Sequence, residues 1–161
     1  MSDEVRRALV VTASNRAAGG VYEDLGGPLI VASLGRAGFE VDGPVVVPDG
    51  DPVEEALRTA VESAYDLVVT TGGTGLTALD LTPDVTRVVI DVEIPGVAEA
   101  IRAKGVASGV PTAVLSRGIA GMAGTTMIVN LPGSTGGVKD GLAVLEPIVG
   151  HAIDQIRGGD H

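Results

Sequence analysis

Short apolar runs alternate with longer amphipathic stretches along most of the chain. The apolar runs are rich in β-branched residues and lack the strict polar and apolar alternation of a half-exposed strand, so they predict strands covered on both faces. Five runs are expected as strands: Ala8–Thr12, Val45–Val47, Leu67–Thr71, Thr112–Leu115 and Met127–Asn130. The pattern therefore favours a sheet with helices on both sides.

Four amphipathic stretches predict helices. Asp51-Pro52 and Thr82-Pro83 each place a capping residue before a proline, which is typical of a helix N-terminus. Apolar side chains then recur on one helical face, from Val53 to Ala64 and from Val85 to Val89. The other two helices are expected over Tyr22–Ala37, ended by Gly38, and over Val138–Ile156, ended by Gly158-Gly159.

The alternation of strands and helices predicts one domain over residues 1–161. Its expected fold class is α/β, a three-layer sandwich around a mostly parallel sheet. In such sheets, ligands bind beyond the carboxyl ends of the strands, at the loops that lead into helices. Candidate chemistry is therefore expected in those loops.

Composition and charge narrow the choice of function. The chain has no cysteine, which excludes a disulfide scaffold, a thiolate zinc site and a cysteine nucleophile. Its formal net charge of −10 argues against nucleic acid and anionic membranes as partners. The first seven residues are charged and lack an apolar signal core. Because no apolar run reaches the roughly 18 residues of a membrane span, we expect a cytoplasmic protein.

Two glycine-rich loops follow predicted strands. Thr70-Thr71-Gly72-Gly73-Thr74-Gly75 can turn sharply and offer successive N–H groups to phosphate oxygens, although an ordinary tight turn uses the same residues. Leu131-Pro132-Gly133-Ser134-Thr135-Gly136-Gly137 opens the last predicted helix, and its Ser134 can be a helix N-cap or a phosphate ligand. Because both loops lie on the same edge of the predicted sheet, together they favour a phosphate-binding site.

Two aspartates, Asp49 and Asp80, stand beside these turns. With Asp51 and Thr82 assigned to capping, they have no evident structural task, although aspartate in a loop is often only turn chemistry. Two carboxylates beside phosphate-binding turns favour a Mg²⁺ ion that bridges carboxylate and phosphate. The sequence offers no Ser-His-Asp set, histidine cluster or glycine-loop lysine. The remaining groups suit phosphoryl or nucleotidyl transfer.

Seven short motifs resemble, in order, the molybdopterin adenylyltransferase family, which comprises bacterial Mog and MoaB proteins and the G domains of gephyrin-like proteins. They are Gly19–Asp24, Val47–Asp49, Thr70–Gly75, Asp80–Asp84, Glu93–Gly96, Pro111–Arg117 and Asn130–Ser134. The resemblance implies a homotrimeric enzyme that joins the terminal phosphate of molybdopterin to the AMP of ATP. The reaction would use Mg²⁺, release pyrophosphate and supply a downstream molybdenum insertase.

The same resemblance assigns roles to individual residues. Asp49 and Asp80 would be the catalytic and metal-binding carboxylates. The substrate site would be lined by Thr71, Gly72, Gly73, Thr74, Gly75, Ser116, Pro132, Gly133 and Ser134. Asn15 and Leu79 depart from the family, whose members often have aspartate and arginine at these places. Two alternatives stay open: a weakly active relative that carries molybdopterin, and the counterpart of a molybdenum-insertase domain.

Overall fold

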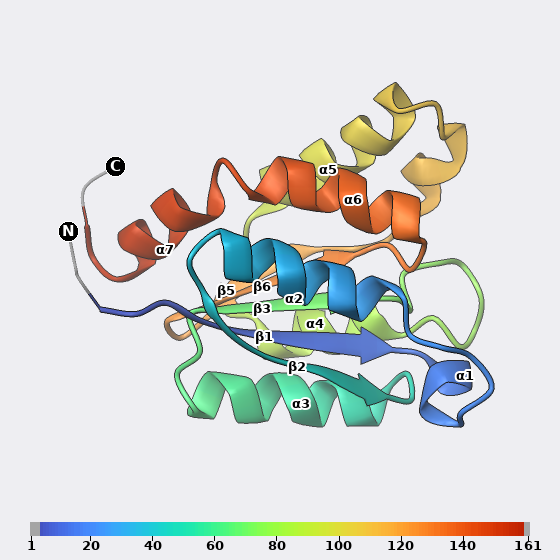
Figure 1. Ribbon diagram of the computed structural model, residues 1–161, viewed down its shortest axis with the longest axis horizontal. Coiled ribbons are helices and arrows are strands. Elements are labelled where there is room, and N and C mark those ends of the chain that lie inside the picture. Colours follow the sequence, from blue (N-terminus) through green and yellow to red (C-terminus); the bar gives the residue numbers. More distant parts are fainter. Residues whose placement is uncertain (1–3, 160–161) are drawn as a thin grey trace.

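The computed structural model describes residues 4–159 and contains a six-stranded sheet flanked by helices (Figure 1). The strands are β1 (Arg7–Ala13), β2 (Glu40–Val47), β3 (Leu67–Thr71), β4 (Val92–Glu93), β5 (Ala120–Ala123) and β6 (Thr126–Leu131). The helices are α1 (Asn15–Ala18), α2 (Gly26–Arg36), α3 (Asp51–Glu62), α4 (Thr82–Val89), α5 (Pro95–Ala107), the 3₁₀ helix η1 (Pro111–Leu115), α6 (Thr135–Leu145) and α7 (Val149–Ile156). None of the helices in this described part is long and apolar enough to cross a membrane.

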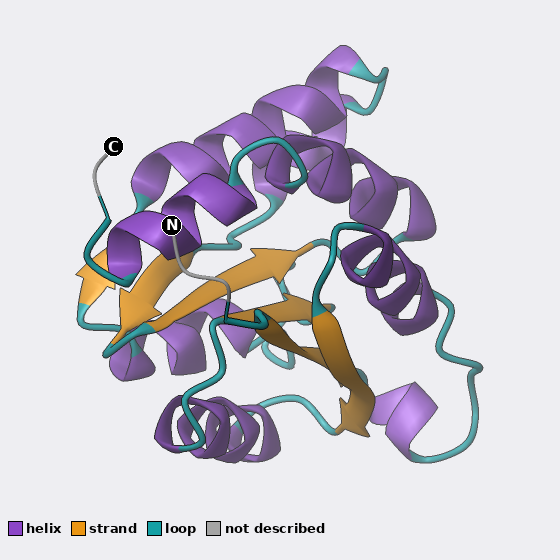
Figure 2. Ribbon diagram, turned by 60° about the vertical axis from the view of Figure 1, so that its left-hand side comes forward, coloured by secondary structure: helices purple, strands orange, loops and turns teal. Residues whose placement is uncertain are grey.

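The sheet has the strand order β2-β1-β3-β6-β5-β4. The first four strands are parallel to one another, and β5 and β4 are antiparallel to their neighbours. Helices cover both faces, as Figure 2 shows. These features confirm the predicted α/β fold with a mostly parallel sheet.

The sheet separates two hydrophobic layers because successive residues of a strand point to opposite faces. In β1, Ala8 and Val10 pack with α2, α5, α6 and α7, whereas Leu9 and Val11 pack with α3 and α4. The strands β3 and β6 are buried along their whole lengths. Burial on both faces explains why these strands appear in the sequence as continuous apolar runs.

One strand prediction is wrong, and two strands were not predicted. The prediction of a strand at Thr112–Leu115 is wrong, because these residues belong to η1 and leave Val114 and Leu115 exposed. Pro111 fixes φ near the helical value at the start of this turn, and an apolar run alone does not separate a strand from a short helix. The sequence did not predict β4 or β5, because β4 has only two residues and β5 is mainly alanine and glycine, which have low β propensity.

Two helix boundaries also differ from those predicted. Helix α2 begins at Gly26 rather than at Tyr22, because the Asp24 carboxylate accepts a hydrogen bond from the amide of the helix's second residue and fixes the chain before it. The single helix expected over Val138–Ile156 is two helices, α6 and α7. Pro147 stands between them and has no N–H to continue the helical hydrogen bonds.

The expected caps of α3 and α4 are wrong. Asp51 and Thr82 are the first helical residues, and the cap positions before them are held by Gly50 and Leu81 without a side-chain hydrogen bond. Instead, Asp49 Oδ1 accepts hydrogen bonds from the amides of both Gly50, at 2.9 Å, and Leu81, at 3.1 Å. Asp49 therefore has a structural task that the sequence did not reveal, since it joins the starts of two helices.

Candidate functional site

The two glycine-rich loops meet at the carboxyl edge of the sheet. The parallel pairing of β3 with β6 sets Thr71 opposite Leu131, so the loops that follow start side by side. Thr71 Oγ1 donates a hydrogen bond to the Pro132 carbonyl at 2.7 Å, and the Gly72 amide donates to the Leu131 carbonyl at 3.3 Å. At Gly72, φ is +89° and a Cβ would stand 2.3 Å from the Ala13 carbonyl oxygen. Only glycine fits there, which explains one glycine of the motif.

Asp49 reaches the same turn from the end of β2. Its Oδ2 atom lies beside Gly73, where a Cβ would come within 2.3 Å of it and of Thr82 Oγ1. The backbone of Asp49 is held by Asn15, whose Oδ1 atom accepts the Asp49 N–H at 3.0 Å. Asn15, which the sequence resemblance sets apart as a departure, orients the Asp49 backbone here through its amide oxygen.

Asp80 closes the far end of the turn. Its Oδ2 atom accepts hydrogen bonds from the Thr77 amide, at 3.0 Å, and from Thr77 Oγ1, at 2.8 Å. A Cβ on Gly75 would stand 2.8 Å from the same oxygen, so the carboxylate lies against the glycine backbone. The structure therefore brings Asp49 and Asp80 to opposite ends of one glycine turn, Gly73 to Gly75.

The charge on Asp49 is unfavourable in this setting. Burial raises the pKa of its carboxyl above the ordinary value, and the nearby charge of Asp80 acts in the same direction. Hydrogen bonds from the Leu81 and Gly50 amides oppose this increase in pKa. The nearby Thr82 hydroxyl is the last of the groups that lower the pKa; it is buried, and it makes no hydrogen bond of good geometry within residues 4–159. A cation beside the two carboxylates would relieve this repulsion.

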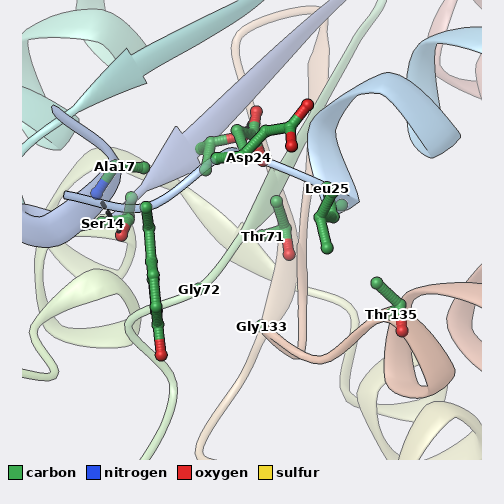
Figure 3. A pocket seen from close by; sticks show the side chains of 13 residues that line it. Ser14, Ala17, Asp24, Leu25, Thr71, Gly72, Gly133 and Thr135 are labelled. Carbon is green, nitrogen blue, oxygen red and sulfur yellow. Dashed lines mark hydrogen bonds between the residues drawn. The ribbon is translucent and has the colours of Figure 1, made fainter. Parts of the chain in front are cut away.

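Two cavities flank the turn. The first, of about 340 Å³, lies between the ends of β1, β3 and β6 and the start of α2 (Figure 3). Its lining includes Ser14, Tyr22, Asp24, Thr71, Gly72, Gly133 and Thr135. The second, of about 460 Å³, lies between α5, η1 and the start of α6. Its lining includes Arg102, Val110, Ser116, Pro132, Ser134 and Lys139.

The predicted site residues are divided between these places. Thr71, Gly72 and Gly133 line the first cavity, and Ser116, Pro132 and Ser134 line the second. Asp49, Gly73, Thr74, Gly75 and Asp80 line neither. The turn nevertheless adjoins both cavities. It directly follows Gly72, which lines the first cavity. It is also joined to the wall of the second cavity, because Arg117, the residue after Ser116, donates its amide to the Thr74 carbonyl. That the predicted residues contact substrates stays a prediction.

The sequence prediction missed several polar residues of the two cavities. Tyr22 and Asp24 line the first, where Asp24 also accepts a hydrogen bond from Thr12 Oγ1 at 2.9 Å. Both residues belong to the motif Gly19–Asp24, which was the one feature of the sequence analysis that could have pointed to them. Arg117, which lines neither cavity, was missed as well, although it ends another of the motifs. Its guanidinium contacts Asp84, which holds the pKa of the Asp84 carboxyl below its usual value.

A Mg²⁺ ion is compatible with the residues at the turn. Residues 4–159 contain no group of three His, Asp or Glu side chains that could form a metal cage. Magnesium, however, commonly binds one or two carboxylates and takes its other ligands from water and substrate phosphates. Asp49 Oδ2 and Asp80 Oδ1 accept no hydrogen bond from this part of the chain, because the bonds to each carboxylate go to its other oxygen. One oxygen of each aspartate is therefore open to an ion that takes its other ligands from water and substrate.

Known proteins resemble this chain over nearly its whole length. Residues 9–151 match the family described as "Probable molybdopterin binding domain". The chain is 38% identical over 153 residues to the molybdopterin adenylyltransferase of Helicobacter pylori, which covers 92% of this chain and 86% of that protein. It is 36% identical over 148 residues to the molybdopterin adenylyltransferase of Escherichia coli, with 89% and 75% covered.

Solved structures agree with these sequence comparisons. The molybdopterin biosynthesis Mog protein from Mycobacterium ulcerans is 52% identical, with a TM-score of 0.92 over 97% of this chain and 99% of that one. The tungsten cofactor synthesizing protein MoaB from Pyrococcus furiosus is 35% identical, with a TM-score of 0.89 over 97% and 99% of the two chains. The chain therefore belongs to the molybdopterin-binding domain family, alongside molybdopterin adenylyltransferases and Mog and MoaB proteins.

Proposed function

We propose that this chain is a magnesium-dependent, cytoplasmic molybdopterin adenylyltransferase, which transfers AMP from ATP to the terminal phosphate of molybdopterin. Relatives that carry this name in Helicobacter pylori and Escherichia coli support the reaction. The observation that carries the proposal is the placement of Asp49 and Asp80 on one glycine turn that adjoins two cavities. A transfer between two polyanionic substrates needs such an arrangement, with one recess for each substrate and a charged centre where they meet.

In this reaction, an oxygen of the terminal phosphate of molybdopterin attacks the α-phosphorus of ATP. A phosphoanhydride bond forms, and the bond between the α-phosphorus and the oxygen that bridges to the β-phosphate breaks. The electron pair of that bond leaves with pyrophosphate. Because the attacking phosphate is already ionised near neutral pH, no residue has to act as a general base. The protein must instead align two polyanions and neutralise their charge.

Backbone amides would orient the phosphates. Helix α6 begins at Thr135, which lines the first cavity, and Ser134 before it lines the second. The first amides of a helix lack intrahelical partners and attract anions. Ser134 Oγ accepts the Gly137 amide at 3.0 Å, so it is the N-cap of α6, and its own proton can still be donated to a phosphate oxygen.

Asp49 and Asp80 would hold the metal ion through Oδ2 and Oδ1, the oxygens that accept no amide or hydroxyl hydrogen bond from residues 4–159. When bound there, Mg²⁺ would neutralise charge on the transferring phosphates. The glycine backbone from Gly73 to Gly75 leaves room for phosphate oxygens close to both carboxylates, since a Cβ at either glycine would collide with one of them.

The proposal includes assembly into a homotrimer that delivers its product to a molybdenum insertase. Large apolar side chains are exposed along residues 88–115, namely Val88, Val92, Val106, Val110, Val114 and Leu115. Closed cyclic assembly would bury such side chains between copies. Sedimentation at micromolar concentration should show a species of about three times the 16.1 kDa chain mass. A species of single-chain mass alone would contradict the trimer.

Pyrophosphate release tests the reaction directly. The purified chain should release pyrophosphate from ATP only when both molybdopterin and Mg²⁺ are present, with one adenylylated molybdopterin formed for each pyrophosphate. Binding of molybdopterin without pyrophosphate release would instead support the carrier role. Omission of Mg²⁺ serves as the matched control, because it leaves both cavities and their residues unchanged.

A further inference from the structure

The loop that carries Asp80 has few contacts of its own. Residues 72–81 form neither helix nor strand, and Leu76 and Leu79 at its tip are 65% and 66% exposed. The bonds between Thr77 and Asp80 join one part of the loop to another. On one side the loop is tied to Asp49 through the Leu81 amide. The start of the loop is tied to α4, because the Thr82 N–H donates to the Gly73 carbonyl at 3.1 Å. The stretch from Thr74 to Asp80 between these bonds requires a further anchor.

Arg117 supplies that anchor. Its backbone N–H donates to the Thr74 carbonyl at 2.8 Å, Nε donates to the Gly75 carbonyl at 3.0 Å, and Nη2 donates to the Asp80 carbonyl at 2.7 Å. The same guanidinium donates to the Asp84 carboxylate, from Nη1 at 3.3 Å and from Nη2 at 3.0 Å. One residue therefore joins the start of the loop, its end and the first turn of α4.

The segment that carries Arg117 is itself fixed to α5. Arg102 Nη1 donates to the Ser116 carbonyl at 3.1 Å and to the Gly118 carbonyl at 2.9 Å, on either side of Arg117. Ser116 and Arg102 also line the second cavity. The contacts thus run without a break from α5, along the wall of a cavity, to the loop that holds Asp80.

We propose that Arg117 is a positioning residue for adenylyl transfer, which holds the Asp80 loop where Asp49 and Asp80 can share one ligand. This inference rests on the proposed function. Arg117 binds the carbonyl of Asp80 rather than its carboxylate and lines neither cavity, so it acts through the loop. The planar fork of guanidinium donors reaches two carbonyls and a carboxylate at once, which a lysine ammonium cannot do.

A role in global stability alone explains these contacts less well. The side chains of Arg117 and Asp84 are 36% and 55% exposed, and ion pairs at such exposure contribute little to stability. The remaining contacts of the guanidinium all go to carbonyls of the one loop that carries a proposed metal ligand. Their effect is therefore expected in the geometry of the loop.

Steady-state kinetics of Arg117→Gln and Arg117→Lys would test the proposal. Arg117→Gln should lower kcat about 30-fold and raise the half-saturating Mg²⁺ concentration about tenfold, with both substrate KM values within about twofold of wild type. Arg117→Lys should have a kcat and a half-saturating Mg²⁺ concentration between those of wild type and Arg117→Gln. Arg87→Gln is the matched control, since Arg87 also pairs with a carboxylate, that of Glu93 at 2.7 Å, and should change none of these constants. A loss of active protein alone would not shift the Mg²⁺ dependence.

Hydrogen exchange of the metal-free protein gives a readout that needs no activity. In Arg117→Gln, the amides of residues 74–82 should exchange at least about tenfold faster, with other segments unchanged. Unchanged exchange together with an unchanged Mg²⁺ dependence would overturn the proposal, and so would uniformly faster exchange along the chain. If Arg117→Gln does not fold, Arg117→Lys decides by the same readouts. If the wild type transfers no AMP, the proposed function fails, while the exchange result still decides whether Arg117 holds the loop.

Discussion

Aspartates lie at both edges of the sheet, but their partners differ. At the amino-terminal edge, Asp66 accepts hydrogen bonds from the Arg7 amide at 2.8 Å and from the Arg157 guanidinium, and its side chain is only 14% exposed. At the carboxyl edge, Asp49 and Asp80 accept hydrogen bonds from amides and one hydroxyl. Within residues 4–159, neither of them is within ion-pair distance of a lysine or arginine.

The comparison separates a carboxylate that is ion-paired within the fold from two that have no ion pair among residues 4–159. A charge removed from water is stable in a protein when an opposite charge and hydrogen bonds replace the water. Asp66 has both, so its charge is already compensated within the fold. Within residues 4–159, Asp49 and Asp80 each have hydrogen bonds to one oxygen and no ion pair, although the Arg117 guanidinium is close enough to Asp80 to interact with its charge. The proposed cation would supply the missing ion pair.

Asp80→Asn gives the largest expected effect. Removal of the charge should lower adenylyl transfer by at least about 100-fold, which corresponds to about 2.7 kcal/mol of transition-state stabilisation. Asparagine Oδ1 can still accept the bonds from Thr77, so the free energy of unfolding should change by about 0.5 kcal/mol or less. Pyrophosphate release and urea unfolding measure the two effects. Wild-type release by the folded variant would contradict the role of Asp80, and loss of folding would support a structural role instead.

How far the sequence could predict this edge depends on the kind of contact. The glycine turn and Asp80 could be singled out as candidates from the sequence because they follow a buried strand and belong to a contiguous motif. The link from Asp49 to the Leu81 amide could not be found, since it joins two loops that are distant in sequence. Arg117 acts on backbone carbonyls, which every residue has, so no pattern of side chains marks its partners. The α/β fold was predictable because it depends on apolar periodicity, whereas η1 was missed because periodicity does not resolve short apolar turns.

Glycines at the two edges provide the second test. Gly73 at the carboxyl edge and Gly158 after α7 both have positive φ, at +69° and +94°. A Cβ at Gly73 would collide with Asp49 and Thr82, whereas a Cβ at Gly158 meets nothing within 4 Å. Gly73→Ala should therefore cost about 2.5 kcal/mol of unfolding free energy and lower transfer, though less than Asp80→Asn does, whereas Gly158→Ala should cost about 1 kcal/mol and leave transfer normal. Equal effects in urea unfolding would show that backbone strain alone, and not contact with the carboxylate, decides the outcome.

Asp66→Asn should have the opposite effects to Asp80→Asn: it should lower stability and leave transfer unchanged. It leaves the mostly buried Arg157 without its counter-charge, so the unfolding free energy should fall by about 2 kcal/mol. For a chain of this length, that loss lowers Tm by roughly 5 °C. Transfer per folded molecule should be unchanged, because Asp66 lies at the other end of the strands. Thermal unfolding would measure the loss of stability, and pyrophosphate release below the lowered Tm would measure transfer. A drop in kcat would contradict the distinction between a structural carboxylate at one edge and catalytic carboxylates at the other.

The two edges should also respond to acid with opposite signs. Hydrogen bonding from Arg6 holds the pKa of Asp154 below its ordinary value of 3.8, so its stabilising effect is present above pH 3.8 and is lost as the pH falls further. Burial raises the pKa of Asp49 above 3.8, so the folded protein binds the Asp49 proton more tightly than the unfolded chain does. The contribution of Asp49 therefore becomes less favourable as the pH rises from 3.8 through its raised pKa.

Asp49→Asn and Asp154→Asn make this difference measurable, with the smallest expected effects. In metal-free protein at pH 7, Asp49→Asn should raise Tm slightly, because asparagine can still accept the two amide bonds and carries no buried charge. Asp154→Asn should lower Tm slightly, because it loses the ion pair with Arg6. As the pH falls, the advantage of Asp49→Asn should disappear once wild-type Asp49 is protonated, whereas the deficit of Asp154→Asn should persist down to pH 3.8 and shrink below it. Scanning calorimetry between pH 3 and pH 7 would measure both differences. If Asp49→Asn lowered Tm at pH 7, the Asp49 carboxylate would be stabilising the fold as Asp66 does, and the contrast between the edges would hold for Asp80 alone.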